Sequence, residues 1–187
     1  MYPILYKFLT IGSVGLIGYK MTKDEFKYYG LLFGENQIKA FITLACKVIS
    51  PGTEKEASLL LAETIAVESD NGKAKDYSTR YGEGLTQFDK GTFDYIQNYY
   101  KAVKFDGLYN KIKGLLGIDI RYCSYSDLRL SPMLSIVYAR LLYLKVPHSI
   151  PGDKFGRWEY YKKYFNSSLG ATTQAKYYAA AEKAVYV

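Results

Sequence analysis

The sequence predicts a mainly α-helical domain with at most one small β-hairpin. Apolar residues recur at three- and four-residue spacing along most of the chain, which is the pattern of amphipathic helices. Alternating strand patterns are few. Hydrophobic residues make up 49% of the 187 residues, enough to bury one core. We therefore expect one compact domain, without internal repeats or low-complexity tracts.

Breaks rich in glycine, proline and polar residues divide the predicted helices. Gly34 separates the first two, and the sequence Ser50-Pro51-Gly52 ends the second. Thr53, with Glu56 three residues later, has the pattern of a capping box. The polar segment 70–84 is expected to be a loop, in which residues 77–81 could form the hairpin with their neighbours. The predicted helices span 24–33, 35–49, 53–69, 89–103, 107–117, 131–145, 157–165 and 172–185.

The N-terminal segment 1–22 differs in composition from the domain expected at 23–187. It is apolar apart from Lys7, and its uncharged run from Phe8 to Tyr19 is shorter than the roughly 20 residues of a membrane span. The favoured interpretation is a helix or hairpin packed on the domain. The alternative is a signal-anchor that gives weak membrane association through residues 2–19.

The net charge of +7 indicates a polyanionic partner, such as nucleic acid, an anionic membrane or an acidic cell wall. No nucleic-acid-binding motif is visible, so a nucleic-acid partner is not expected. Cys46 and Cys123 are too few for a disulfide framework or a zinc site, and His148 reads as a loop residue. We therefore expect no metal and no cofactor.

One acidic residue interrupts an apolar helix face. Within 53–69, apolar residues share one face at helical spacing, and continuing the series leads to Glu68, whereas Glu63 falls at the edge of that face. Apolar surroundings and the negative end of the helix dipole both disfavour a charged carboxylate. Glu68 is thus expected to hold a proton near neutral pH and to act as a general acid. A solvated carboxylate at a frayed helix end is the alternative.

Several short motifs resemble those of soluble lytic transglycosylases and goose-type lysozymes, two groups of the lysozyme-like superfamily. Glu68-Ser69 followed by Gly84-Leu85-Thr86-Gln87-Phe88 is similar to their Glu-Ser and Gly-Leu-Met-Gln signature. Thr92-Phe93 stands where related phage enzymes carry Thr-Trp. Two further segments carry similar motifs. Residues 127–133 are similar to a helix-entry motif, and residues 164–170 are similar to an aromatic-Asn motif followed by a glycine turn.

The resemblance implies an α+β lysozyme-like fold and a role for each matching residue. Glu68 would be the acid and then the base, and Ser69 would orient it or a substrate N-acetyl group. Gly84 and Leu85 would form the cleft floor, beside Phe88, and Gln87 would bind substrate or a neighbouring site residue. Tyr164, with Asn166, would line the cleft opposite Glu68. Because the motif is shifted by one residue, Tyr161 is the fallback for that role.

A second carboxylate would decide the reaction type. A hydrolase needs a base or nucleophile at a defined distance from the acid. Asp89 follows Gln87-Phe88 as an Asp does in goose-type lysozymes, so it is the candidate. Lytic transglycosylases need none, because the substrate's own 6-hydroxyl attacks and leaves a 1,6-anhydro sugar. Both outcomes stay open at this point.

The expected function is cleavage of the β-1,4 bond between N-acetylmuramic acid and N-acetylglucosamine in peptidoglycan. The small size resembles that of phage endolysins or virion-associated enzymes, made in the host cytoplasm or carried in the virion, and acting as monomers in the periplasm or wall. The alternative is a catalytically inactive lysozyme-like module that binds the wall or builds the virion. A small membrane-associated partner protein would leave the Glu68–Gln87 spacing unexplained.

Overall fold

Seven α-helices account for most of the chain that the structure, a computed structural model, describes, namely residues 29–74, 82–167 and 170–187. Two short 3₁₀ turns, η1 (Val103–Phe105) and η2 (Tyr125–Arg129), and a π-helical turn, η3 (Lys162–Asn166), connect some of them. The predicted mainly α-helical class is confirmed. The helices are α1 (Gly34–Ile49), α2 (Glu54–Ser69), α3 (Lys90–Tyr100), α4 (Asp106–Leu116), α5 (Pro132–Lys145), α6 (Lys154–Tyr161) and α7 (Gln174–Ala181).

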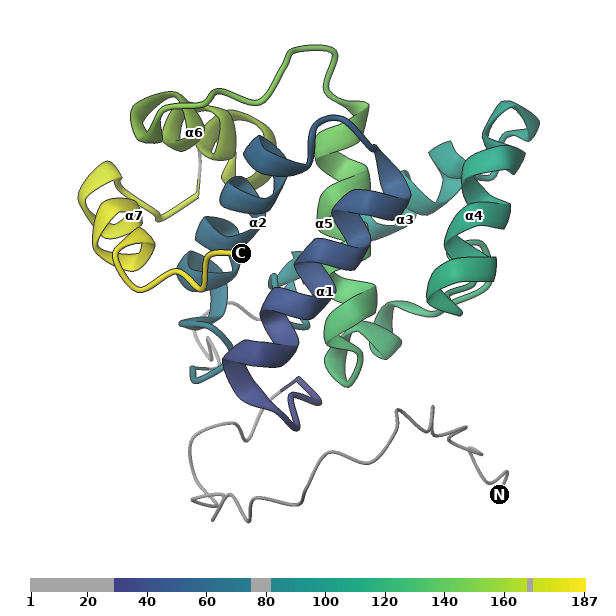
Figure 1. Cartoon of the computed structure of the whole chain (residues 1–187), viewed down its shortest axis with the longest axis horizontal. Helices are drawn as coiled ribbons and strands as arrows, with labels where there is room; N and C mark the ends of the chain where they lie inside the picture. The colour runs from purple at the N-terminus through teal and green to yellow at the C-terminus, as the bar shows by residue number, and fades with distance from the viewer. Residues whose placement is uncertain (1–28, 75–81, 168–169) are drawn as a thin grey trace.

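Helix α2 lies at the centre of the arrangement. It packs between α1 and α5 on one side and α6 and α7 on the other, and α4 covers the far side of α1 (Figure 1). Because α2 has neighbours on several sides, most of its residues are buried, polar ones included. The core around it consists largely of aliphatic side chains from α1, α2 and α5, among them Ile38, Ile42, Leu60, Leu61, Ile65, Ile136 and Leu141.

A two-stranded antiparallel hairpin follows α2. Strand β1 (Gly82–Glu83) pairs with β2 (Phe88–Asp89) in the register Glu83 to Phe88. Gly84 begins the turn with a φ of +77°, and a Cβ on it would lie 2.6 Å from the carbonyl oxygen of Leu128. Only glycine fits both that conformation and that close approach. The predicted hairpin exists, but residues 77–81 lie outside the described residues.

Two local predictions at the N-terminal side were wrong. Residues 29–33 do not continue a helix, because Tyr29 and Gly30 both have positive φ and form a turn before α1. The remainder of the predicted helix 24–33, and all of segment 1–22, lie outside the described residues. Thr53 precedes α2 as predicted but makes no capping hydrogen bond, because its hydroxyl donates back to Ser50. No helix among the described residues has the length and hydropathy to cross a membrane.

Candidate functional site

Glu68 and Tyr161 meet at the junction of α2 and α6. The Tyr161 hydroxyl donates a hydrogen bond to Glu68 Oε1 at 2.6 Å, and the Tyr161 ring, fully buried, stacks on Phe165. Burial raises the pKa of Tyr161, and the neighbouring Glu68 raises it further. The phenol therefore keeps its proton and serves Glu68 as a fixed donor. Tyr161, the fallback in the sequence reading, is the tyrosine that meets the acid.

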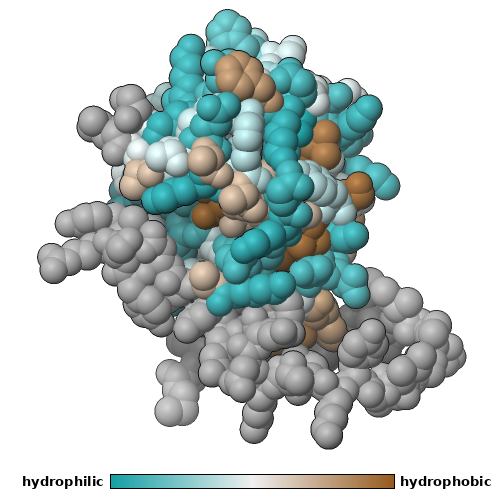
Figure 2. Space-filling model, turned by 90° about the vertical axis from the view of Figure 1, so that its left-hand side faces the viewer, coloured by the Kyte–Doolittle hydropathy of each residue, from teal (hydrophilic) through white to brown (hydrophobic). Residues whose placement is uncertain are grey.

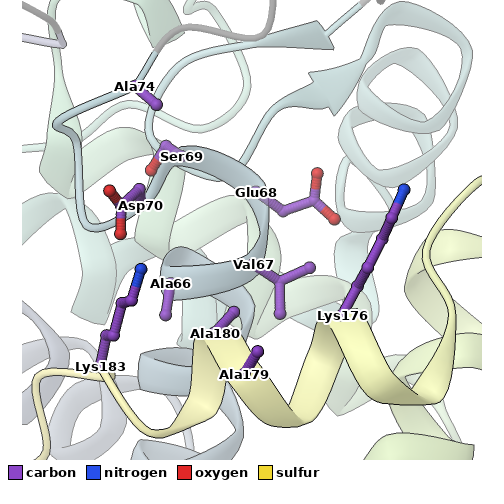
Figure 3. A pocket seen from close by; sticks show the side chains of 10 residues that line it. All are labelled: Ala66, Val67, Glu68, Ser69, Asp70, Ala74, Lys176, Ala179, Ala180 and Lys183. Carbon is purple, nitrogen blue, oxygen red and sulfur yellow. The ribbon is translucent and has the colours of Figure 1, made fainter.

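Glu68 forms part of the wall of an open cavity of about 470 Å³ between the end of α2 and α7. Its carboxylate points toward the side of the cavity where Lys176 rises from α7, while Asp70 and Lys183 lie at the other end (Figure 3). Alanines of α7 form the floor between the two lysines. The face that carries α6 and α7 is mostly hydrophilic among its coloured atoms (Figure 2). The cavity thus combines a half-buried acid with cationic side chains.

Ser69 links this helix end to the hairpin turn. Its hydroxyl donates to the carbonyl oxygen of Leu85 at 2.7 Å and accepts from the backbone N–H of Gly72 at 3.1 Å. Ser69 is 1% exposed and Leu85 is completely buried. The two residues therefore hold the loop against α2 rather than offering side chains to a ligand.

The motifs that resemble those of lysozyme-like enzymes pack against one another. Besides the Ser69–Leu85 bond, the Thr86 N–H donates to Ser135 Oγ at 3.0 Å, next to Gly84. Phe88 makes edge contacts with Phe165 and Tyr138, and Phe93 stacks on Tyr138. Segments far apart in the sequence are thus brought together around the end of α2. The Thr86 hydroxyl also hydrogen-bonds the Ser135 hydroxyl, at 2.9 Å.

Gln87 connects the hairpin turn to Tyr29, which precedes α1, through hydrogen bonds. Its Nε2 donates to the Tyr29 hydroxyl at 2.9 Å and to the Gly84 carbonyl at 2.8 Å. Its Oε1 is buried and has no hydrogen-bond partner among the described residues. The amide protons are engaged within the protein, so only the oxygen is left to accept from another group.

Three residues expected at the substrate cleft have other positions. Phe88 is 2% exposed in the core, so its ring offers no face to a sugar. Tyr164 packs edge-on against Tyr160 instead of facing Glu68. Asn166 donates a hydrogen bond to Thr172 and accepts one from Lys162, so its side chain is engaged within the protein. The π-helical turn η3 explains why Tyr164 and Asn166 do not face Glu68. It rotates the residues after Tyr161 away from the positions that a continuing α-helix would give them.

Asp89 caps helix α3. Its exposed carboxylate accepts a hydrogen bond from the Thr92 N–H at 2.8 Å, and it is not among the residues that line the Glu68 cavity. An Asp three residues before the bonded N–H is a standard N-cap arrangement, which the sequence reading overlooked. The other loop acid, Glu83, forms an ion pair with Arg129.

Sequence reasoning misjudged Glu63, which is completely buried and not at the edge of a face. Arg157 donates two hydrogen bonds to it, from Nε and Nη2, each at 2.8 Å. The hydroxyls of Tyr177 and Tyr186 donate two more, at 2.6 and 3.1 Å. Glu63 is saturated by these donors and lines neither cavity, whereas Glu68 lines the cavity beside α7. A buried glutamate requires such a cation, but its identity could not be read from spacing alone.

Comparison with known protein families, curated proteins and solved structures finds no match for this chain. The described residues contain no cluster of three or more His, Cys, Asp or Glu suited to a metal ion. Cys46 is buried in the core, and His148 is exposed in the loop between α5 and α6. The site therefore has to be interpreted from its own geometry.

Proposed function

We propose that the chain cleaves the β-1,4 bond between N-acetylmuramic acid and N-acetylglucosamine in peptidoglycan, with Glu68 as the general acid. The observation that carries this proposal is a half-buried carboxylate at the end of a core helix, oriented by a buried tyrosine and bordering an open cavity. Glycosidic cleavage needs a positioned acid that protonates the leaving oxygen. The hydrogen bond from Ser69, next to Glu68, to Leu85 supports the same reading, because it joins two of the segments that resemble lysozyme-like motifs.

The charges of the cavity fit an acidic glycan. Lys176 and Lys183 line it together with Glu68 and Asp70. Peptidoglycan carries carboxylates on its stem peptides, which lysines on the cavity wall can bind without approaching the scissile bond. The net charge of +7 acts in the same direction over longer range.

Asp89 caps a helix outside the cavity, and Asp70 lies at the end of the cavity away from Glu68 (Figure 3), which favours a mechanism with one carboxylate. We therefore infer a lytic-transglycosylase outcome, in which Glu68 first protonates the leaving oxygen and then accepts the proton of the substrate's 6-hydroxyl as it attacks. The test is digestion of purified peptidoglycan followed by mass spectrometry of the products. We expect 1,6-anhydro ends. Reducing ends would indicate a muramidase, and binding without products would support the inactive wall-binding module.

Replacing Asp89 with asparagine separates the two roles of this residue. Asparagine caps helices about as well as aspartate but carries no charge. The Asp89→Asn variant should keep both the melting temperature and the rate of muropeptide release. A large loss of rate at unchanged melting temperature would contradict the capping role and establish Asp89 as a base or nucleophile.

Replacing Tyr161 with phenylalanine should lower the catalytic rate by about 10- to 100-fold, since one hydrogen bond to a charged group contributes on the order of 1.5–3 kcal/mol. The ring and its stacking on Phe165 remain, so we expect a reduced kcat with little change in KM. Steady-state kinetics on a soluble glycan fragment, with melting temperatures alongside, measures this. If the variant has a changed melting temperature but an unchanged kcat, Tyr161 contributes to packing and not to catalysis.

A further inference from the structure

A second cavity holds a buried cation. Arg140 on α5 is 2% exposed, and among the described residues it has no carboxylate partner. Its Nη2 donates to Thr53 Oγ1 at 3.0 Å, whereas its Nε is buried without a hydrogen-bond partner. Burial lowers the pKa of Arg140 below its usual range. The contrast with Arg157, which is fully paired with Glu63, shows that this fold does provide counterions elsewhere.

The groups that surround Arg140 do not offset its charge. Burial raises the pKa of the Cys46 thiol to about 11 and that of the Tyr160 phenol to about 12, so both are neutral at pH 7. The pKa of Tyr100 is also raised by burial. Glu54, close in sequence to Thr53, bonds the N–H of Gly52 instead. A buried guanidinium remains charged and is costly when left unpaired.

Arg140 lines an open cavity of about 480 Å³ beneath the loop that joins α5 to α6. The other lining residues include the apolar Leu144, Val146 and Ile150, the acidic Glu56, and the polar Ser50, Thr53, His148, Ser149 and Tyr160. A ligand in this cavity would thus meet one buried cation, one acidic residue, and a wall that is partly apolar and partly polar but uncharged apart from His148 when protonated. The cavity does not share lining residues with the one that contains Glu68.

We propose that this cavity binds a small monocarboxylate, whose oxygens accept hydrogen bonds from the Arg140 guanidinium. The planar fork of a guanidinium matches a carboxylate in geometry and charge. Glu56 in the wall disfavours a dianion such as hydrogen phosphate, and the apolar wall suits a short aliphatic tail. This site is independent of the proposed glycan cleavage.

Sodium acetate titrated into the full-length protein tests the proposal, against sodium chloride at equal ionic strength. The ¹H–¹⁵N signal of the Arg140 Nε–Hε group should shift in a saturable manner with acetate and not with chloride. At about ten times the Kd, the melting temperature should rise by roughly 3 °C. Sodium phosphate should give a weaker response than acetate.

The Arg140→Met variant should fold, because an apolar side chain of similar length removes the desolvation cost, and it should lose the acetate response. The matched control is Lys47→Met, which removes one exposed positive charge from α1 and should keep the response. Absence of a saturable shift in the wild type, an equal response from Arg140→Met, or tighter binding of phosphate would each overturn the proposal. If Arg140→Met does not fold, the wild-type titration decides alone.

Discussion

Replacing Glu68 with glutamine should lower the rate of peptidoglycan cleavage by about 10²- to 10⁴-fold, the usual contribution of a positioned general acid. Glutamine keeps the size of the side chain and can still accept the hydrogen bond from Tyr161, but it cannot deliver a proton to the leaving oxygen. Because Glu68 is only half-buried, at the edge of a cavity, we expect the fold to tolerate the change. Muropeptide release from purified peptidoglycan, quantified by mass spectrometry, measures the effect.

Glu159→Gln provides the matched control. It makes the same chemical change at an exposed position of α6 that does not line the Glu68 cavity, and it should leave the rate unaltered. Full activity in the Glu68→Gln variant would contradict the proposed mechanism. Equal losses in both variants would point to a general effect of charge on glycan binding.

Replacing Glu63 with glutamine should destabilise the fold by about 3–5 kcal/mol, since it leaves the Arg157 guanidinium buried without its counterion. Arg157 stays charged in the variant because a guanidinium does not lose its proton in proteins, so the cost cannot be relieved by neutralisation. For a chain of this size, the melting temperature should fall by on the order of 10 °C. Thermal and urea unfolding, followed by circular dichroism, measures both quantities.

Asp94→Asn is the control for Glu63. It breaks an exposed ion pair with Lys90 on α3 and should cost less than about 1 kcal/mol. The double variant Glu63→Leu with Arg157→Met should recover part of the loss, because it removes both buried charges. A Glu63→Gln variant as stable as wild type would show that the two tyrosine hydroxyls alone satisfy this position.

Local spacing predicted much of the helical framework. Predicted helices at 35–49, 107–117 and 131–145 correspond within a residue or so to α1, α4 and α5, since apolar periodicity and Gly or Pro boundaries act within a few residues. The spacing of apolar residues did not predict the turn around Tyr29 and Gly30 or the π-helical turn η3. Both depend on backbone conformations that the residue pattern does not specify.

Some features of the candidate site could likewise be predicted from the sequence, and others could not. The sequence by itself marked Glu68 as an acid at the end of an apolar helix, because apolar periodicity is a local property. Only the tertiary structure decided that Glu63 pairs with Arg157, that Tyr161 and not Tyr164 meets Glu68, and that Arg140 has no counterion among the described residues. Each of these depends on which helices pack together. A side chain's partners in low-dielectric surroundings come from distant segments, so the sequence near it cannot identify them.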